Sequence, residues 1–220
     1  MATTARQQLP AEPPHDCALC PRLASFREEN DAAHPDWFNA PVPGFGDEAA
    51  WLLIMGLAPG LKGANRTSRP FTGDFAGDLL YPTLLSCGLA EGTYAAHPDD
   101  GLTLRGAFIS NAVRCVPPQN KPIGSEINNC RPFLIGQLNA LPQLTHIVAL
   151  GRIAHESLIR ALGGKLKDTP FRHGAHHKIG GYILADSYHC SRYNTNTGRL
   201  TADMFAAVFQ AVIADRNATA

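Results

Sequence analysis

The stretch AWLLIMGLAPG, residues 50–60, is a short apolar run that ends in glycine and proline. A run of this length, bounded by turn residues, predicts a buried β-strand. Three later segments have the same form: GAFISNAVRC (106–115), THIVALG (145–151) and GYILADSY (181–188). The chain therefore contains four predicted buried strands.

Helical patterns separate these strands and follow the last one, over residues 77–90, 124–142, 152–164 and 201–218. Ser125 and Thr201 are candidate N-caps, Pro142 ends its helix, and Pro82 is compatible only with a first helical turn. Strands that alternate with helices pair in parallel through right-handed crossovers. The sequence therefore predicts the α/β class, with three layers arranged as an α/β/α sandwich.

The composition is that of an ordinary globular protein, with 45% hydrophobic and 17% charged residues. A chain of 220 residues can bury one full core. We expect a flexible N-terminal tail over 1–13 and a single domain over 14–220. No apolar run approaches the roughly 18 residues of a membrane span, and the N-terminus lacks the apolar segment of a secretory signal. These features predict a protein of the cytoplasm, or of the nucleoid if its partner is DNA.

The charge is zero overall but unevenly distributed. Residues 1–50 contain three Arg and eight Asp or Glu, whereas residues 51–220 contain sixteen Lys or Arg and eleven acidic residues. A basic excess favours an anionic partner. Binding to nucleic acid needs only a local basic stripe, so zero net charge does not exclude it.

The segments that follow three predicted strands are the most polar and glycine-punctuated parts of the chain. They are GLAPGLKGANRTSRPFTGD (56–74), SNAVRC (110–115) and SYHCSRYNTNTGR (187–199). In parallel sheets, ligands bind beyond the carboxyl ends of the strands. We therefore expect these loops to form one ligand-binding edge.

The loop over 56–74 matches neither the Walker A pattern nor the Rossmann glycine pattern, which disfavours a nucleotide cofactor. Phe71 and Asp74 are unusual in it, because a turn requires neither. Phe71 either packs in the core or contacts a ligand. Asp74 either caps the following helix, pairs with a cation or takes part in the chemistry. A basic segment over 165–178 either contacts phosphates or forms a solvated hairpin.

Six cysteines occur in a chain for which disulfides are not expected. Cys17 and Cys20 form a Cys-x2-Cys pair, and Cys115 and Cys130 lie fourteen residues apart. Four thiolates can hold a zinc ion or a [4Fe–4S] cluster, and unrelated buried cysteines remain the alternative. The other two are interpreted as structural, because Cys87 lies on an apolar helical face and Cys190 points away from its neighbour His189.

Five motifs in order resemble those of the uracil-DNA glycosylase superfamily, most closely its iron–sulfur family 5. They are GLAPG, NRTSRPFTGD, SNAVRC, NNCRPF and SYHCSRYNTNTGRLT, and with the cysteines they span the chain from residue 17 to the final helix. The resemblance implies a central four-stranded parallel sheet and a structural [4Fe–4S] cluster on Cys17, Cys20, Cys115 and Cys130.

The resemblance also implies an activity and a partner. The expected enzyme is a monofunctional, monomeric DNA glycosylase that flips uracil, and other deaminated bases such as hypoxanthine, out of DNA. It hydrolyses the N-glycosidic bond and leaves an abasic site for base excision repair. The expected partner is therefore DNA that contains such bases.

Individual roles follow from the matching motifs. Phe71 resembles the aromatic residue that stacks on the base, Asn111 the amide that pairs with its edge, and His189 the donor to the departing base. The GLAPG motif implies that Gly56 and Ala58 belong to the base-binding site. Predicted DNA contacts are Arg66, Arg69, Arg192, Tyr193 and Asn194.

Two departures from related motifs affect the chemistry. Many relatives have an acidic or amide residue where this chain has Leu57 and Ala58, and Asp74 is the compensating candidate that activates water or stabilises the sugar cation. Ser68 replaces a glycine that is common before RPF. A family 4 glycosylase is an alternative that Leu57 disfavours, since that family has Glu there. An iron–sulfur module that binds DNA damage without turnover is another alternative.

Overall fold

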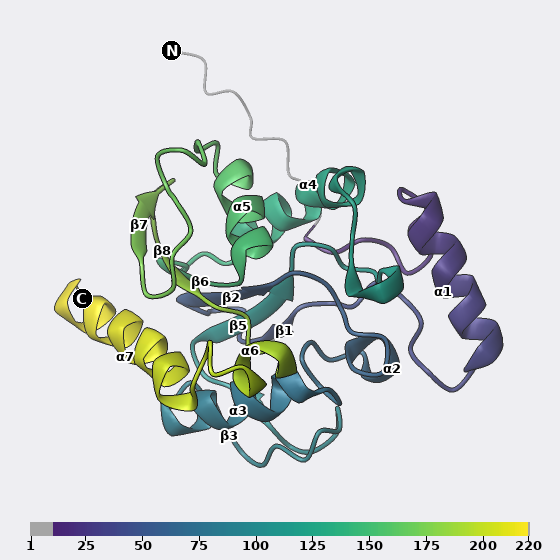
Figure 1. Cartoon of the computed structure of the whole chain (residues 1–220), viewed down its shortest axis with the longest axis horizontal. Helices are drawn as coiled ribbons and strands as arrows, with labels where there is room; N and C mark the ends of the chain where they lie inside the picture. Colours follow the sequence, from purple (N-terminus) through teal and green to yellow (C-terminus); the bar gives the residue numbers. More distant parts are fainter. Residues whose placement is uncertain (1–10, 220) are drawn as a thin grey trace.

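Four parallel strands form the centre of a six-stranded sheet in the computed structural model, which describes residues 11–219 (Figure 1). The parallel strands, in spatial order, are β5 (Ala107–Asn111), β2 (Leu52–Gly56), β6 (His146–Leu150) and β8 (Tyr182–Ser187). Short antiparallel strands extend the two edges, β1 (Phe45–Gly46) beside β5 and β7 (His176–Ile179) beside β8. The predicted four-stranded parallel core is confirmed, and the two edge strands are additions that the sequence did not predict.

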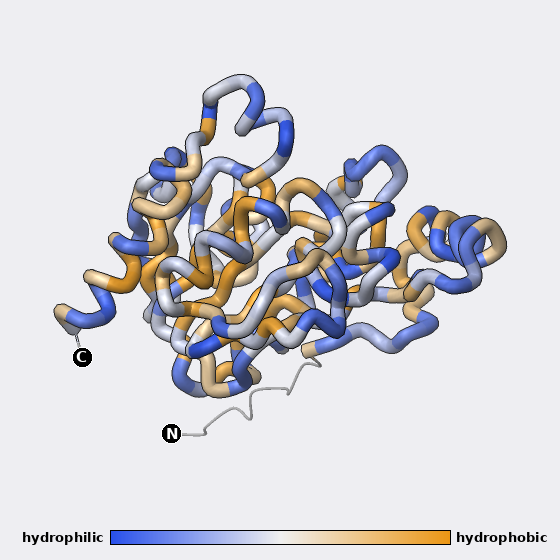
Figure 2. The backbone as a smooth tube through the Cα atoms, turned by 90° about the horizontal axis from the view of Figure 1, so that it is seen from below, coloured by the Kyte–Doolittle hydropathy of each residue, from blue (hydrophilic) through white to orange (hydrophobic). Residues whose placement is uncertain are grey.

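Helices cover both faces of the sheet, which confirms the three-layer α/β/α prediction (Figure 1). Because strand residues alternate between faces, Leu52 and Ile54 pack toward one helical layer and Leu53 and Met55 toward the other. Figure 2 shows the resulting apolar interior between polar outer segments. The first layer contains α3 (Phe75–Ser86) and α7 (Ala202–Thr219), and the second contains α4 (Gly124–Ala140) and α5 (Arg152–Ala161).

The remaining elements are short or peripheral. Helix α1 (Pro21–Ala33) lies at one side of the molecule (Figure 1) and is joined to α4 by an ion pair between Arg22 Nε and Glu126 Oε1 at 2.8 Å. No helix in the described part of the chain is both long and apolar enough to cross a membrane. The others are α2 (Ala64–Thr67), β3 (Ala90–Glu91), β4 (Thr103–Leu104), η1 (Pro118–Asn120) and α6 (Arg192–Asn196).

Two helix starts differ from expectation. Helix α3 begins at Phe75, so Pro82 lies inside it rather than in its first turn. The proline lacks an N–H for the carbonyl of Asp78, but Asp78 is exposed, and water can replace that hydrogen bond. Ser125 is not the N-cap of α4, because the helix begins at Gly124 and Glu126 Oε2 accepts from the Ile123 N–H at 2.8 Å.

The cap at Thr201 is confirmed, since its hydroxyl accepts from the Met204 N–H at 3.1 Å.

The N-terminal boundary needs a correction. Residues 1–10 of the predicted flexible tail lie outside the described residues. Within the rest of the predicted tail, Glu12 Oε2 lies 2.9 Å from Arg114 Nη1, and its Oε1 accepts from the Gly44 N–H at 3.0 Å. This part of the segment is therefore attached to the body of the protein.

Candidate active site

A pocket of about 620 Å³ lies at the carboxyl edge of the sheet, where the loops after β2, β5 and β8 meet. We call it the main pocket. Four side chains singled out in the sequence line it together: Phe71, Asp74, Asn111 and His189. Its volume is within the range of small-molecule sites, and its walls are largely apolar with a few convergent polar groups.

A close approach in this site is made at Gly56, which pairs in register with Asn111 at the end of β5. A Cβ at residue 56 would lie 2.3 Å from Asn111 Oδ1 and 2.7 Å from Phe71 Cζ. Only glycine therefore leaves room for both side chains. Gly56 itself does not line the pocket, whereas Ala58, the other predicted residue of the GLAPG motif, does.

Asp74 caps a helix and also lines the main pocket. Its Oδ1 accepts from the N–H groups of Ala76 and Gly77 at 3.1 and 3.3 Å, so the carboxylate is the N-cap of α3. Its Oδ2 points toward Gly60 and Gly63, where added Cβ atoms would lie only 2.9 and 2.5 Å away. Burial raises the pKa of Asp74 although the two backbone bonds oppose that effect, so this carboxylate binds a proton more readily than an exposed one.

His189 faces Phe71 across the pocket, with their ring centroids 6.0 Å apart. Burial lowers the pKa of His189 to about 4, so the imidazole is neutral at physiological pH. Neighbouring groups hold its backbone: Asn194 Nδ2 donates to the His189 carbonyl at 2.8 Å. The adjacent Tyr188 N–H donates to His173 Nδ1 at 3.1 Å. The backbone around His189 is therefore held in place, and its imidazole is uncharged.

The residues predicted to contact DNA occupy different environments. Arg192 is exposed at the rim of the main pocket, and Tyr193 is 72% exposed next to it. Arg66 is exposed but lines a separate hollow on the surface. The side chain of Asn194 is engaged with the His189 carbonyl rather than directed outward.

Arg69 was predicted to contact DNA, and its place in the structure contradicts that prediction. Its side chain is 4% exposed and forms a bidentate pair with Asp100, with N–O distances of 2.8 and 2.7 Å. Its Nε donates to Thr72 Oγ1 at 2.7 Å. These buried partners occupy the guanidinium, so Arg69 is a structural residue and not a surface contact for DNA.

A second hollow adjoins the main pocket and shares Leu57 and His189 with it. Its volume is about 400 Å³. We call it the arginine groove, because Arg152, Arg172 and Arg199 line it. No acidic residue lines it within residues 11–219. This group was not predicted from the sequence, because the three arginines come from separate segments; the basic composition of 165–178 was the one signal for Arg172.

Asn120 was also missed. It lines the main pocket from the loop after β5 and has a φ of +57°, in the left-handed region that asparagine tolerates better than most residues. Its place in a proline-rich loop gave no sequence signal.

The four cysteines Cys17, Cys20, Cys115 and Cys130 surround one small apolar cavity between α1 and α4. Several N–H groups point at their sulfurs, including Arg114 N at 3.4 Å from Cys130 Sγ and Arg27 Nη1 at 3.7 Å from Cys115 Sγ. Cys190 is fully buried and burial raises its pKa, which fits the structural interpretation of that residue.

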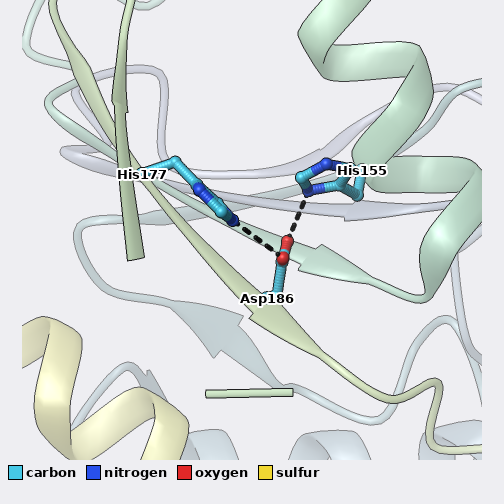
Figure 3. A group of neighbouring side chains, drawn as sticks. All are labelled: His155, His177 and Asp186. Atoms are coloured by element: carbon cyan, nitrogen blue, oxygen red, sulfur yellow. Dashed lines mark hydrogen bonds and ion pairs between the residues drawn. The ribbon is translucent and has the colours of Figure 1, made fainter. Parts of the chain in front are cut away.

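His155, His177 and Asp186 form another group of potential metal ligands (Figure 3). His155 Nδ1 lies 2.7 Å from Asp186 Oδ1, and His177 Nε2 lies 3.1 Å from Asp186 Oδ2. Two ligands of one tetrahedral zinc lie about 3.3 Å apart, given metal–ligand bonds of about 2.0 Å. The shorter contact is therefore a direct hydrogen bond, and the group joins α5, β7 and β8 as a buried polar network.

Comparison with known proteins agrees with this architecture. A sequence model of the family described as the uracil DNA glycosylase superfamily matches residues 43–213. The type-5 uracil-DNA glycosylase of Thermus thermophilus is 48% identical, over 87% of this chain and 90% of that protein. The type-5 uracil-DNA glycosylase of Pyrobaculum aerophilum is 38% identical, over 91% and 89%. The type-4 uracil-DNA glycosylase of Saccharolobus solfataricus is 29% identical, over 78% and 76%.

The superfamily match spans every strand of the central sheet and the side chains that meet in the main pocket, which defines an enzyme of the N-glycosyl hydrolase class. Identity is higher, over more of the chain, for the type-5 relatives than for the type-4 relative. The chain belongs to the uracil-DNA glycosylase superfamily and, within it, to the type-5 uracil-DNA glycosylases.

We expect the imidazole of His189 to stay neutral until the pH falls to about 4, because burial penalises the imidazolium. Its pKa in the unfolded chain is about 6.5, so protonation destabilises the folded state as the pH falls between these two values. Titration by 15N NMR, with His189→Gln used to assign the signal and a urea-unfolded sample as control, measures both pKa values. A folded-state pKa at or above that of the unfolded sample would contradict the burial argument.

Proposed function

We propose that this uracil-DNA glycosylase excises uracil from DNA as a monofunctional enzyme, leaving an abasic site with the strand intact. One observation supports this most directly. An aromatic ring, an amide, a neutral imidazole and a partly buried carboxylate converge on one pocket large enough for a base. These are the groups that stacking, edge recognition, leaving-group stabilisation and attack by water require.

Recognition of the base uses Phe71 and Asn111. A base inside a duplex cannot reach this pocket, so the nucleotide must first rotate out of the stack. The ring of Phe71 then stacks on the base. The Asn111 amide accepts from N3–H and donates to O4 of uracil, because an amide offers an acceptor and donors in one plane.

Bond cleavage uses His189 and Asp74. As the bond between C1′ and N1 breaks, its electron pair moves onto the base and negative charge develops at O2. The neutral imidazole of His189 donates a hydrogen bond to that oxygen and need not transfer its proton. Asp74, ionised above its raised pKa, either accepts a proton from the water that attacks C1′ or stabilises the positive sugar.

The substrate range is broader than uracil in this proposal. Leu57 and Ala58 line the pocket and present no polar side chain that would reject a different ring. Hypoxanthine has the same N–H and carbonyl arrangement on its pairing edge, so Asn111 can bind it in the same way. Uracil and hypoxanthine are therefore the proposed substrates.

The cysteine cavity fits a [4Fe–4S] cluster better than zinc. A single zinc holds its thiolates within about 3.8 Å of one another, given Zn–S bonds of about 2.3 Å. Among the described residues, no three of the cysteine sulfurs all lie within 4.8 Å of each other. The wider spacing and the N–H groups directed at sulfur suit iron–sulfur ligation by Cys17, Cys20, Cys115 and Cys130. Such a cluster would join α1 to α4 and take no part in bond cleavage.

Contacts to the DNA backbone extend beyond the predicted residues. Arg192 and Tyr193 lie at the rim of the main pocket, and the arginine groove lies directly beside it. Cation–π contacts hold two of the groove side chains, with Arg199 4.5 Å from the Tyr188 ring and Arg152 5.9 Å from Phe171. A groove with three cations and no acid in its described lining favours phosphates of the strand that leaves the pocket.

Asp74→Asn should lower the single-turnover rate of uracil release by about 10²- to 10⁴-fold, the usual contribution of general acid–base catalysis. The unfolding free energy should change by less than about 1 kcal/mol, because an asparagine oxygen also caps a helix. The assay uses a uracil duplex with and without hot alkali, and Asp78→Asn, an exposed neighbour, is the control.

Strand cleavage only after alkali would support a monofunctional glycosylase. The wild-type rate should rise with pH through the raised pKa of Asp74, and the variant should lack that rise. Full activity of Asp74→Asn would contradict the assignment of this residue. Binding without release of uracil or hypoxanthine by the wild type would favour the damage-binding alternative.

The purified protein should be brown, with broad absorption near 400 nm and about four irons per chain. Cys115→Ser should lose this absorption, and Cys87→Ser, which lies outside the cavity, should retain it. A colourless protein with one zinc per chain would contradict the cluster proposal.

Arg172→Ala and Arg199→Ala should each weaken binding to uracil-free duplex and reduce the salt dependence, by about 0.9 in the slope of log K against log salt per lost phosphate contact. Lys178→Ala removes an equal charge from β7 outside the groove and should leave the slope unchanged. Equal slopes for all variants and the wild type would exclude the groove as a phosphate contact.

A further inference from the structure

Phe71 has a strained backbone although its ring is almost fully buried. Its φ is +54°, while the side chain is only 7% exposed. The left-handed region is a genuine outlier for a bulky residue and is energetically unfavourable. Relaxation of this backbone would carry the ring away from Gly56 and Asn111. Some other part of the fold must therefore hold it in place.

Two tyrosines hold the peptide groups on either side of Phe71. The Tyr81 hydroxyl donates to the Pro70 carbonyl at 2.5 Å, and the Tyr94 hydroxyl donates to the Phe71 carbonyl at 3.4 Å. Their rings stack on each other, with centroids 4.7 Å apart.

The Arg69–Asp100 pair joins the two loops that supply these contacts. Asp100 is 1% exposed in its side chain and also accepts from the N–H groups of Ala95 and Leu102, at 2.9 and 3.1 Å. The loop that contains Tyr94 is therefore folded around the same carboxylate that holds Arg69. The guanidinium lies 5.2 and 5.9 Å from the rings of Tyr81 and Tyr94.

Helix α3 has a glycine, Gly77, at the point where it meets the strained turn. A Cβ at Gly77 would lie 1.8 Å from the Phe71 carbonyl oxygen and 2.4 Å from the Tyr94 hydroxyl. The helix can approach the strained turn only because residue 77 lacks a side chain. The contact between Tyr94 and Phe71 is thus built into the packing of the helix.

We infer that Arg69, Tyr81, Tyr94 and Asp100 form a clamp that holds Phe71 in its strained conformation and thereby prepares the ring to bind the flipped base. We call these four residues the Phe71 clamp. They are positioning residues, since they act through Phe71 and none of them lines the main pocket. The inference rests on the proposed role of Phe71 and adds residues that set the affinity for the extrahelical base.

Tyr94→Phe is the most direct test, because it removes one hydroxyl and leaves the buried ion pair intact. Loss of one hydrogen bond corresponds to about a 3- to 10-fold change in an equilibrium constant. The dissociation constant is measured by fluorescence anisotropy on a duplex with 2′-fluoro-2′-deoxyuridine, whose glycosidic bond resists cleavage, relative to an undamaged duplex. We expect Tyr94→Phe to weaken the uracil-dependent part of binding by about that factor. Tyr182→Phe, the same change far from the pocket at the start of β8, should not.

A double-mutant cycle separates positioning from general stability. In a Phe71→Ala background, Tyr94→Phe should have almost no further effect on uracil-dependent binding, because the ring through which it acts is absent. An equal loss in both backgrounds, or no loss in either together with a lowered melting temperature, would overturn the clamp and leave Tyr94 a merely structural residue.

A second readout does not depend on DNA. The Cα and Cβ NMR shifts of Phe71 report its backbone conformation, and they should move away from left-handed values in Tyr94→Phe. Unchanged shifts would overturn the clamp even if the enzyme bound no uracil. Failure of the wild type to distinguish the fluorinated duplex from the undamaged one would instead count against the proposed function.

Discussion

The parallel register that places Gly56 beside Asn111 is the constraint on which the site depends. Strand β2 pairs with β5 on one side and β6 on the other, and its residues are buried against both helical layers. A slip by one residue would move every side chain of the strand to the opposite face, so the apolar packing fixes the register. The loop after β2 then leaves the sheet next to Asn111, and Phe71 can return to the glycine at the end of the strand.

The distribution of charge in and around the main pocket fits the proposed chemistry. The four predicted site residues in the main pocket are an aromatic ring, an amide, an imidazole kept neutral by burial and one carboxylate with a raised pKa. The cations in its lining, Lys62 and Arg192, are exposed. Hydrogen bonds are stronger in such a low-dielectric environment than in water, so in the proposed mechanism a neutral donor suffices to stabilise a departing base. The arginines lie outside, in the arginine groove and at the pocket rim, where they can meet phosphates without the cost of burial.

Two residues show that a structural role and a functional motif are not alternatives. Asp74 uses one oxygen to cap α3, which confirms that interpretation, and points the other toward the glycines of the pocket loop, where the proposed chemistry requires it. Arg69 belongs to the same motif, yet its planar guanidinium is buried in a bidentate pair among aromatic rings. Arginine suits that place because its fixed fork of donors matches a carboxylate and stacks on aromatic faces.

The sequence by itself determined the parallel core, the three layers and the edge of the sheet at which the site lies, because apolar periodicity and strand–helix alternation are local properties of the chain. It also placed Phe71, Asp74, Asn111 and His189 on loops that this topology must bring together. Only the tertiary structure decided which polar side chains are paired within the protein and which are exposed. Arg69 is engaged by Asp100, which is distant in sequence, and the Asn194 side chain is engaged by the His189 carbonyl. The two-residue β1 is too short for a periodic pattern, and the arginine groove combines three separate segments. Burial and pairing are set by contacts across the folded chain, and no local pattern encodes them.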